Sequence, residues 1–239
     1  GSVGLAYASV VNAGRPRVPM TMVTHNWGNR FSHLMASIFA DCLGERSFQR
    51  VSGYLKSSAG RAILREQLRP HVGSVYWVCA FSVNQHATLC HHAPDPEHTP
   101  SRMFWDPCTC CTKKHTTGEE SEANKFDHMM EHLFHTSLHF SQVVAVDDSF
   151  ALFKRIWCVA ELNQARELGI PQRLSILSSD VLEGNRAKLK KLDVVEAEAS
   201  RPEDKAYILS KIKDPAEFSR NVRALLLDEE SGLAPAWGA

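Results

Sequence analysis

The stretch FSQVVAVDDSFALFKRIWCVAELNQARELGIPQRLSIL, from Phe140 to Leu177, decides the fold. It begins with Ser141–Val146, a short apolar run rich in β-branched residues, which is typical of a buried parallel strand. A helix is predicted over Ala151–Leu168, because Asp-Asp-Ser precedes it as a cap and a glycine and a proline follow it. Another strand is expected at Arg173–Leu177. The stretch is therefore predicted to be a strand–loop–helix–strand unit.

Two residues of this helix are candidates for a site. Trp157 and Glu161 are four residues apart, which places them about one turn apart on the same face. Glu161 lies among apolar residues, so its carboxylate is expected to be paired or partly desolvated. An aromatic ring beside a carboxylate suits a ligand with a flat ring and a developing positive charge. The structural alternative packs Trp157 in the core and leaves Glu161 in solvent, and the spacing alone leaves both interpretations open.

A similar unit lies near the start of the chain. Met20–Thr24 is predicted as the first strand, and a polar loop over His25–Arg30 leads into a helix over Phe31–Leu43. The free N–H groups of that helix favour an anion such as phosphate, to which Arg30 could add a bidentate contact. Neither G-x-G-x-x-G nor the P-loop motif is present, which argues against a standard dinucleotide fold or an NTPase.

Short apolar runs alternate with helical segments, which predicts a parallel α/β sheet with helices on both faces. Ser74–Phe81 and Val194–Ala199 complete a five-stranded parallel sheet, for which we expect the flavodoxin-like order 2-1-3-4-5. Ligands of such sheets bind beyond the carboxyl ends of strands one and three. Asp147–Phe150 and Asn84–His86 are therefore expected to meet the first loop at one crevice. This convergence favours the functional interpretation of Glu161.

The remaining segments complete the predicted organisation. Residues 1–19 are an extended lead-in, residues 20–227 a single α/β domain, and residues 228–239 a flexible tail. Ser47–Leu55 is a weakly patterned connector. Further helices are predicted at Gly60–Leu68, Asn124–Phe140, Ser178–Leu192, Pro202–Ile212 and Pro215–Leu227.

A Cys/His-rich insertion interrupts the domain at about residues 88–123. Its Cys108, Cys110, Cys111 and His115 could hold a structural zinc ion. The C-x-C-C spacing differs from the usual C-x(2–4)-C pair, and adjacent ligands strain a tetrahedral site. The alternative is a mobile loop with free thiols. No cofactor is expected to be required.

Composition limits the classes of partner. Lys plus Arg and Asp plus Glu both number 27, so the chain lacks the basic footprint of a nucleic-acid binder. No apolar run approaches the length of a membrane span, and no signal-peptide pattern opens the chain. Seven cysteines without scaffold spacing predict a reducing, cytoplasmic setting. The leading Gly-Ser is typical of a tag remnant, so the chain could be part of a longer protein.

The residues of the central unit resemble the TIR (Toll/interleukin-1 receptor) superfamily. VVAVDDSFALFKRIWCVAEL is similar to the family's apolar strand, Ser-containing loop and helix with W-C-x-x-E-L, here Trp157, Cys158, Glu161 and Leu162. MTMVTHNWGNRF is similar to the first TIR strand, its loop and the following helix. The resemblance covers roughly Met20 to Leu177, and the Cys/His insertion departs from it.

This resemblance implies cleavage of NAD+ at the nicotinamide–ribose bond, by hydrolysis or ADP-ribosyl cyclisation, in a self-assembled oligomer. Glu161 matches the essential carboxylate of the enzymatic members, and a carboxylate suits an oxocarbenium-like transition state. The implied substrate-binding residues are His25, Asn26, Trp27, Arg30, Asn84, Ser149 and Trp157. Two alternatives remain: a non-catalytic TIR signalling scaffold that acts by homotypic association, and a flavodoxin-like N-glycosidase that acts on nucleosides.

Overall fold

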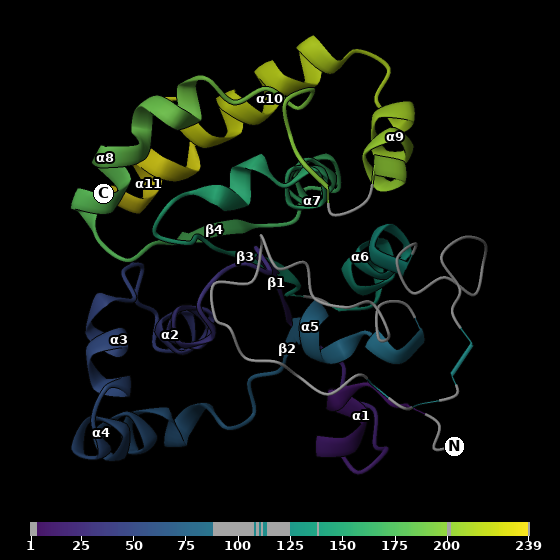
Figure 1. The fold of residues 1–239 in the computed structure, drawn as a ribbon. Coiled ribbons are helices and arrows are strands. Elements are labelled where there is room, and N and C mark those ends of the chain that lie inside the picture. Colours follow the sequence, from purple (N-terminus) through teal and green to yellow (C-terminus); the bar gives the residue numbers. More distant parts are fainter. Residues whose placement is uncertain are drawn as a thin grey trace.

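A four-stranded, all-parallel sheet forms the centre of the protein (Figure 1). The computed structural model describes residues 4–87, 108, 110, 112–113, 125–137, 139–199 and 202–238. The strand order is β2-β1-β3-β4, which is compatible with a flavodoxin-like arrangement. The strands are β1 (Thr21–His25), β2 (Tyr76–Val78), β3 (Ser141–Ala145) and β4 (Gln172–Ser175).

The predicted fifth strand does not form within the described residues, and this part of the fold prediction is wrong. Residues 194–199 turn instead: Val194 O accepts the Ala197 N–H, and Asp193 Oδ1 accepts the Val195 N–H. The β-type pairing of these residues with the rest of the described chain is one isolated bridge, between Arg155 and Glu198. Local turn bonds use the backbone groups that a ladder would need, so alternating side chains alone did not make a strand.

Three helices lie on one side of the sheet: α2 (Phe31–Cys42), α3 (Gln49–Leu55) and α4 (Ser58–Leu68) (Figure 1). Leu34 and Ile38 of α2 pack on Val23 and Ala145 of the sheet. The predicted connector over residues 47–55 is therefore largely helical. Its apolar side chains pack on α2 and α4 rather than on the sheet, which explains its weak sequence pattern.

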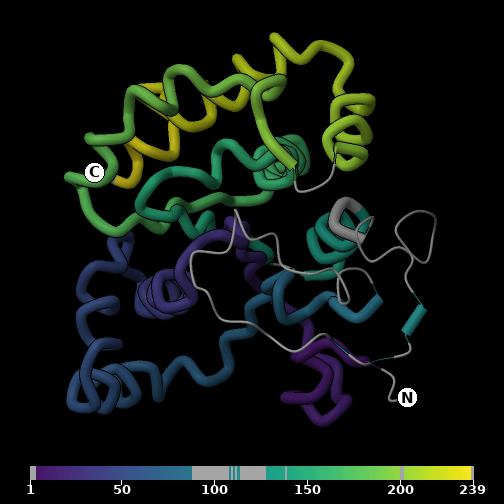
Figure 2. Tube along the Cα trace, in the orientation of Figure 1, coloured from purple at the N-terminus to yellow at the C-terminus, as the bar shows by residue number. Residues whose placement is uncertain are grey.

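The opposite side carries α6 (Lys125–Thr136) and α7 (Ile156–Glu167), with Met22 of β1 packed against Met130 and Ala165. Beyond them lie the C-terminal helices, which share the largest apolar cluster with α7. They are α8 (Ser179–Lys190), α9 (Pro202–Lys211), α10 (Pro215–Leu227) and α11 (Leu233–Gly238). Figure 2 shows the yellow C-terminal helix, α11, next to β4 although it is last in sequence.

The helix predicted from Ala151 is divided in two. A 3₁₀ turn, η4 (Ala151–Lys154), precedes α7, and Arg155 between them is extended with φ −91° and ψ 117°. Phe150 starts η4 in the left-handed region at φ 60°, while its ring is 2% exposed. Burial of the ring on one side and the Arg155–Glu198 bridge on the other account for the interruption.

Several short elements complete the chain: α1 (Tyr7–Val11), η1 (Arg69–His71), α5 (Cys79–Ser82) and η2 (Gln85–Ala87). The predicted strand over residues 74–81 is thus only Tyr76–Val78, because α5 begins at Cys79. In the predicted tail, Trp237 of α11 donates its indole N–H to Arg46 O at 2.7 Å. Within the described residues, no helix combines the length and apolarity needed to cross a membrane.

Candidate functional site

The candidate site lies where β1 and β3 end. The chain passes from β1 to β2 on one side and returns to β3 on the other, so the strand order reverses between β1 and β3. His25 and Ala145 are the last paired residues of these two strands. Helices leave the carboxyl ends of neighbouring strands in opposite directions at such a point, which opens a crevice there.

Glu161 is attached to this end of the sheet by a chain of hydrogen bonds. Thr24 Oγ1 donates to Glu161 Oε2 at 2.5 Å, and Gln142 Nε2 donates to Thr24 Oγ1 at 2.8 Å. Gln172 Nε2 in turn donates to Gln142 Oε1 at 2.7 Å. Because each side chain accepts from one neighbour and donates to the next, the bonds run in one direction across β4, β3 and β1. The chain ends on the carboxylate and orients it as an acceptor.

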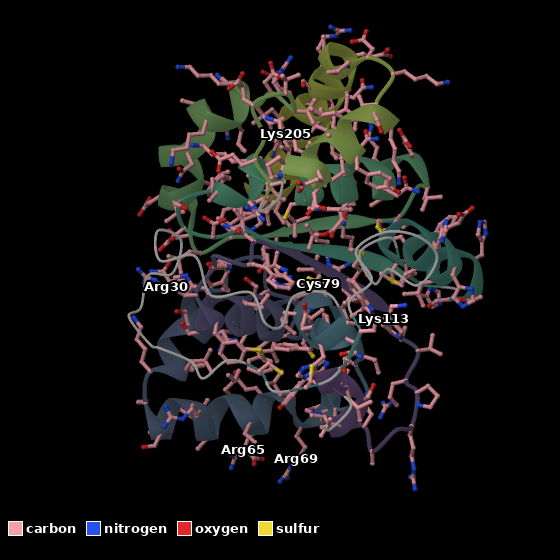
Figure 3. All side chains as sticks on the ribbon, turned by 45° about the vertical axis from the view of Figure 1, so that its right-hand side comes forward. Arg30, Arg65, Arg69, Cys79, Lys113 and Lys205 are labelled. Carbon is pink, nitrogen blue, oxygen red and sulfur yellow. The ribbon has the colours of Figure 1, made fainter. Side chains whose placement is uncertain are left out.

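Cys79, which is labelled in Figure 3, lies at the amino end of α5 beside Glu161. Its thiol connects the first loop to α5. The Trp27 indole N–H donates to Cys79 Sγ at 3.2 Å, and the His25 ring nitrogens lie 3.8 and 3.9 Å from the same sulfur. Cys158, one turn before Glu161 on α7, donates its thiol to His25 O at 3.5 Å. The first loop and α7 therefore meet over the end of β1.

Burial favours the neutral forms of three groups near Glu161: Cys79, Cys158 and His25. Burial raises the pKa of Cys79 to about 12, and the negative charge of Glu161 adds to the shift. Burial and Glu161 likewise raise the pKa of Cys158 well above its usual value. Burial lowers the pKa of His25, against a smaller opposing effect of the Val23 carbonyl. A protonated thiol beside a neutral imidazole is a poor nucleophile, so this Cys–His pair does not suit cysteine-type catalysis.

The loop after β3 is organised by Asp147, which is 4% exposed. Its Oδ1 accepts the N–H groups of Ser149 and Ala151, and its Oδ2 accepts the Leu152 N–H at 2.8 Å. The Ser149 hydroxyl also donates to Asp147 Oδ1 at 2.5 Å. Ser149, predicted to bind substrate, is thus part of the cap that starts η4.

Arg30 and Asn26 belong to the outer part of the first loop. Asn26 Oδ1 accepts the Gly28 N–H at 3.0 Å and shapes the turn. The Arg30 side chain is 72% exposed, and its guanidinium lies 4.0 Å from Asp148. Figure 3 shows Arg30 at the edge of the molecule, well away from Cys79. Arg30 is also the N-cap residue of α2, whose start has no side-chain cap.

Trp157 lies on the side of α7 that packs against α9. Its ring lies 6.4 Å from that of Tyr207 on α9 and lines a cavity of about 500 Å³ together with Ala160 and Gln164. Glu161 instead faces the sheet, as its hydrogen bond to Thr24 requires. The exposed indole beside the site is that of Trp27, which is 52% exposed. Trp157 thus packs towards α9, while Glu161 is bonded to β1.

Asn84 lies farther along the loop that follows α5. Its Nδ2 donates to Gly4 O at 3.0 Å, and its Oδ1 accepts the His86 N–H at 3.1 Å. Asn84 thus holds the N-terminal segment to this loop. Of the predicted zinc ligands, Cys108 and Cys110 are described and lie next to His86, whereas Cys111 and His115 lie outside the described residues.

Sequence reasoning missed the three residues whose side chains form the hydrogen-bond chain to the carboxylate: Thr24, Gln142 and Gln172. Two of them carried a signal, because Thr24 and Gln142 are polar residues inside runs that were predicted to be buried strands. A buried polar side chain needs a partner, so such a position indicates a hydrogen-bond network. The identity of that partner depends on strand register, which the sequence does not contain.

Comparisons of the chain with protein-family models, with curated proteins and with solved structures find no match. What the protein does is therefore inferred from the geometry of the site and from the residues themselves.

Proposed function

We propose that the protein is an NAD+ glycohydrolase or ADP-ribosyl cyclase of the TIR type, with Glu161 as its essential carboxylate. The observation that carries the proposal is the one-way chain of hydrogen bonds that ends on Glu161, at the end of β1 where the strand order reverses. Ligand sites of parallel α/β sheets occur at this position. The resemblance of W-C-x-x-E-L to the TIR block supports the same residue.

The reaction would break the bond between ribose C1′ and the nicotinamide nitrogen. The bonding electrons leave with nicotinamide, which becomes neutral, while positive charge develops on the ribose. The Glu161 carboxylate stabilises that charge, and the Thr24 hydroxyl fixes its orientation beforehand. Water then adds at C1′ and loses a proton, which yields ADP-ribose, or a ring nitrogen of the adenine adds instead and yields the cyclic product.

The two buried thiols near Glu161 favour this role because they add no negative charge of their own. Cys79 and Cys158 stay protonated, since burial and the negative charge of Glu161 both raise their pKa values. A carboxylate with low-dielectric walls interacts more strongly with a developing cation than one in water. The exposed Trp27 indole offers a flat surface on which the nicotinamide or adenine ring can stack.

The phosphates would lie at the start of α2. This helix begins without a side-chain cap, so its first N–H groups and its positive dipole end face the loop over residues 25–30. Arg30 is exposed, and its 4.0 Å contact with Asp148 is long enough to be exchanged for a phosphate. In this arrangement Trp157 does not contact the substrate, and Ser149 acts through the loop that Asp147 caps.

NAD+ consumption with product identification tests the proposal, at high protein concentration because an assembly is expected. Glu161→Gln and Glu161→Ala should each lower nicotinamide release by at least about 100-fold. Glu167→Gln is the matched control, because Glu167 is on the same helix, is exposed and accepts a hydrogen bond from Asn163 Nδ2 at 2.7 Å. Circular dichroism checks the fold of each variant. Turnover that survives in Glu161→Gln, or no turnover by the wild type, would refute the proposal.

A non-catalytic scaffold that acts by homotypic association is the second candidate. It is favoured by a group of exposed aromatic side chains beside the edge strand β2. Tyr7 and Phe31 are 63% and 66% exposed, and their rings lie 5.6 and 6.2 Å from that of Phe81. Such surfaces often mark interfaces between proteins. Without NAD+ turnover, concentration-dependent assembly that Phe31→Asp abolishes in light scattering would favour this candidate.

A further inference from the structure

A cluster of metal-ligand side chains lies apart from Glu161. His86, Cys108 and Cys110 each offer one ligand atom, and these atoms all lie within 4.8 Å of one another. His86 Nδ1 is 3.3 Å from Cys108 Sγ. Cys110 is 7% exposed, which is low for a residue outside the helices and strands of the described chain. Residues far apart in sequence are thus gathered at one point.

Two further contacts hold these segments together. The Gly4 N–H donates to Thr112 Oγ1 at 3.0 Å, while Gly4 O accepts from Asn84. A side chain at Gly4 would not fit, because its Cβ would lie 2.0 Å from His86 Cγ. The backbone at Gly4 is therefore in close contact with the His86 imidazole. The N-terminal segment also connects the segment that carries the cysteines to the loop that carries His86. The cluster is a packed junction of three segments.

The spacing of the ligand atoms suits a tetrahedral zinc ion. Bond lengths of about 2.3 Å to sulfur and about 2.0–2.1 Å to nitrogen place a sulfur and a nitrogen ligand about 3.6 Å apart around one ion. The observed 3.3 Å between His86 Nδ1 and Cys108 Sγ is close to that value. Two thiolates and an imidazole favour Zn²⁺ over the hard cations Mg²⁺ and Ca²⁺, which prefer oxygen.

We propose that His86 Nδ1, Cys108 Sγ and Cys110 Sγ bind a structural Zn²⁺ ion. The ion displaces the two thiol protons, and the fourth ligand is either water or a group outside the described residues. This ligand set differs from the one predicted from sequence in that His86 takes the place of His115 and Cys111 is not required. Adjacent cysteines on one ion, which would strain the tetrahedron, are thereby avoided.

The ion would also stabilise α5 and the loop that follows it. His86 follows Gln85, whose Nε2 donates to Cys79 O at 3.2 Å. Cys79 begins α5 beside the candidate site. The unfolded chain has no preformed site, so the free energy of zinc binding adds to the stability of the folded segment from Cys79 to His86.

Zinc content of the whole chain tests the proposal directly. The protein is purified under reducing conditions, stripped with a chelator and titrated with ZnCl₂, and bound metal is measured by mass spectrometry. Wild type should bind one ion and show a higher thermal midpoint with zinc than without it. Co²⁺ in place of zinc should give the absorption of tetrahedral thiolate ligation. Substoichiometric zinc with no thermal shift would overturn the proposal.

The comparison of two histidine variants identifies the ligand set. His86→Ala, Cys108→Ser and Cys110→Ser should each weaken zinc binding by at least about 100-fold, since even loss of groups that only orient a ligand costs 10–100-fold. His71→Ala, at an exposed histidine of η1 that is not in the cluster, and Cys42→Ser are the matched controls and should bind as the wild type does. His86→Ala with unchanged affinity would overturn the assignment, whatever the cysteine variants do. Both readouts are independent of NAD+ turnover.

Discussion

Replacement of Thr24 by valine should uncouple Glu161 from the sheet while it keeps the shape of the side chain. Thr24 is fully buried, and its hydroxyl both donates to Glu161 Oε2 and accepts from Gln142 Nε2. Valine fills the same volume and makes neither bond. Glu161 then loses the donor that orients its carboxylate, and the Gln142 Nε2 donor keeps only its 3.4 Å contact with Glu161 O. The loss is thus electrostatic and involves no cavity.

The magnitude follows from these contacts. A hydrogen bond to a charged group is worth about 1.5–3 kcal/mol, and a donor left partly unsatisfied costs about 1 kcal/mol more. Thr24→Val should therefore lower the free energy of unfolding by about 3 kcal/mol. For a chain of this size that corresponds to a fall in Tm of about 6–12 °C. Thr24→Ser retains the hydroxyl and should recover most of the loss.

Thr21→Val is the matched control for this prediction. Thr21 lies on the same strand and is 9% exposed, but its hydroxyl bonds Ser141 Oγ at 3.3 Å, and neither group is charged. That bond is worth about 0.5–1 kcal/mol. Urea unfolding followed by circular dichroism measures both variants. Equal losses in Thr24→Val and Thr21→Val would show that the contact with Glu161 adds nothing, and the reasoning about an oriented carboxylate would fail.

Two further predictions concern stability. Burial lowers the pKa of His25 in the folded protein, so below about pH 6.5 the unfolded chain binds more protons than the folded one. The free energy of unfolding should therefore fall, by up to about 1.4 kcal/mol per pH unit, as the pH is lowered below about 6.5. The pKa of Cys79 is raised to about 12 in the folded protein, so the free energy of unfolding should also fall as the pH rises above about 9, where the thiol of the unfolded chain ionises. Cys79→Ala should reduce this loss of stability at high pH, as measured by urea unfolding. Gly53 of α3 has open space around it, so Gly53→Ala should stabilise the protein by about 0.5–1 kcal/mol. Gly60→Ala should destabilise the protein, because the new Cβ would lie 2.3 Å from Tyr54 O. Equal thermal midpoints for Gly53→Ala and Gly60→Ala would contradict the packing of α3 on α4.

The sequence predicted the first four strands and most helices because their signals are local. Apolar runs, caps and a proline at the first turn determine α10, whose bounds, Pro215–Leu227, agree with the prediction. The fifth strand failed for a non-local reason. Val194 and Ala197, three residues apart, are buried against the C-terminal helices, whereas Val195 is 45% exposed, so burial follows a turn rather than the two-residue repeat of a strand. Whether such a segment joins the sheet depends on a partner strand that is distant in sequence.

The neighbours of Trp157 show what the helix spacing leaves undetermined. Residues four apart on a helix are offset by about 40°, which is enough to fall on different sides of a boundary. On α7 that boundary lies between Trp157, which lines the cavity with Ala160, and Glu161, which faces the sheet with Cys158. The position of the boundary is set by α9 on one side and β1 on the other. Neither element could be placed from the residues of α7.

Stability alone gives no reason for the network that holds Glu161. Gln142 is fully buried, and it joins Thr24 to Gln172 between two apolar clusters. Apolar side chains of similar volume would fill the same space at no cost in desolvation, and such replacements of buried polar groups are often neutral or stabilising. A structural role would also be met by any pairing of these groups. Gln172 Nε2 also donates to Leu162 O at 3.0 Å, but the three bonds between side chains run in order towards one carboxylate. That carboxylate lies at the end of the sheet where parallel α/β sheets commonly bind ligands, and such an order suits a preorganised catalytic group.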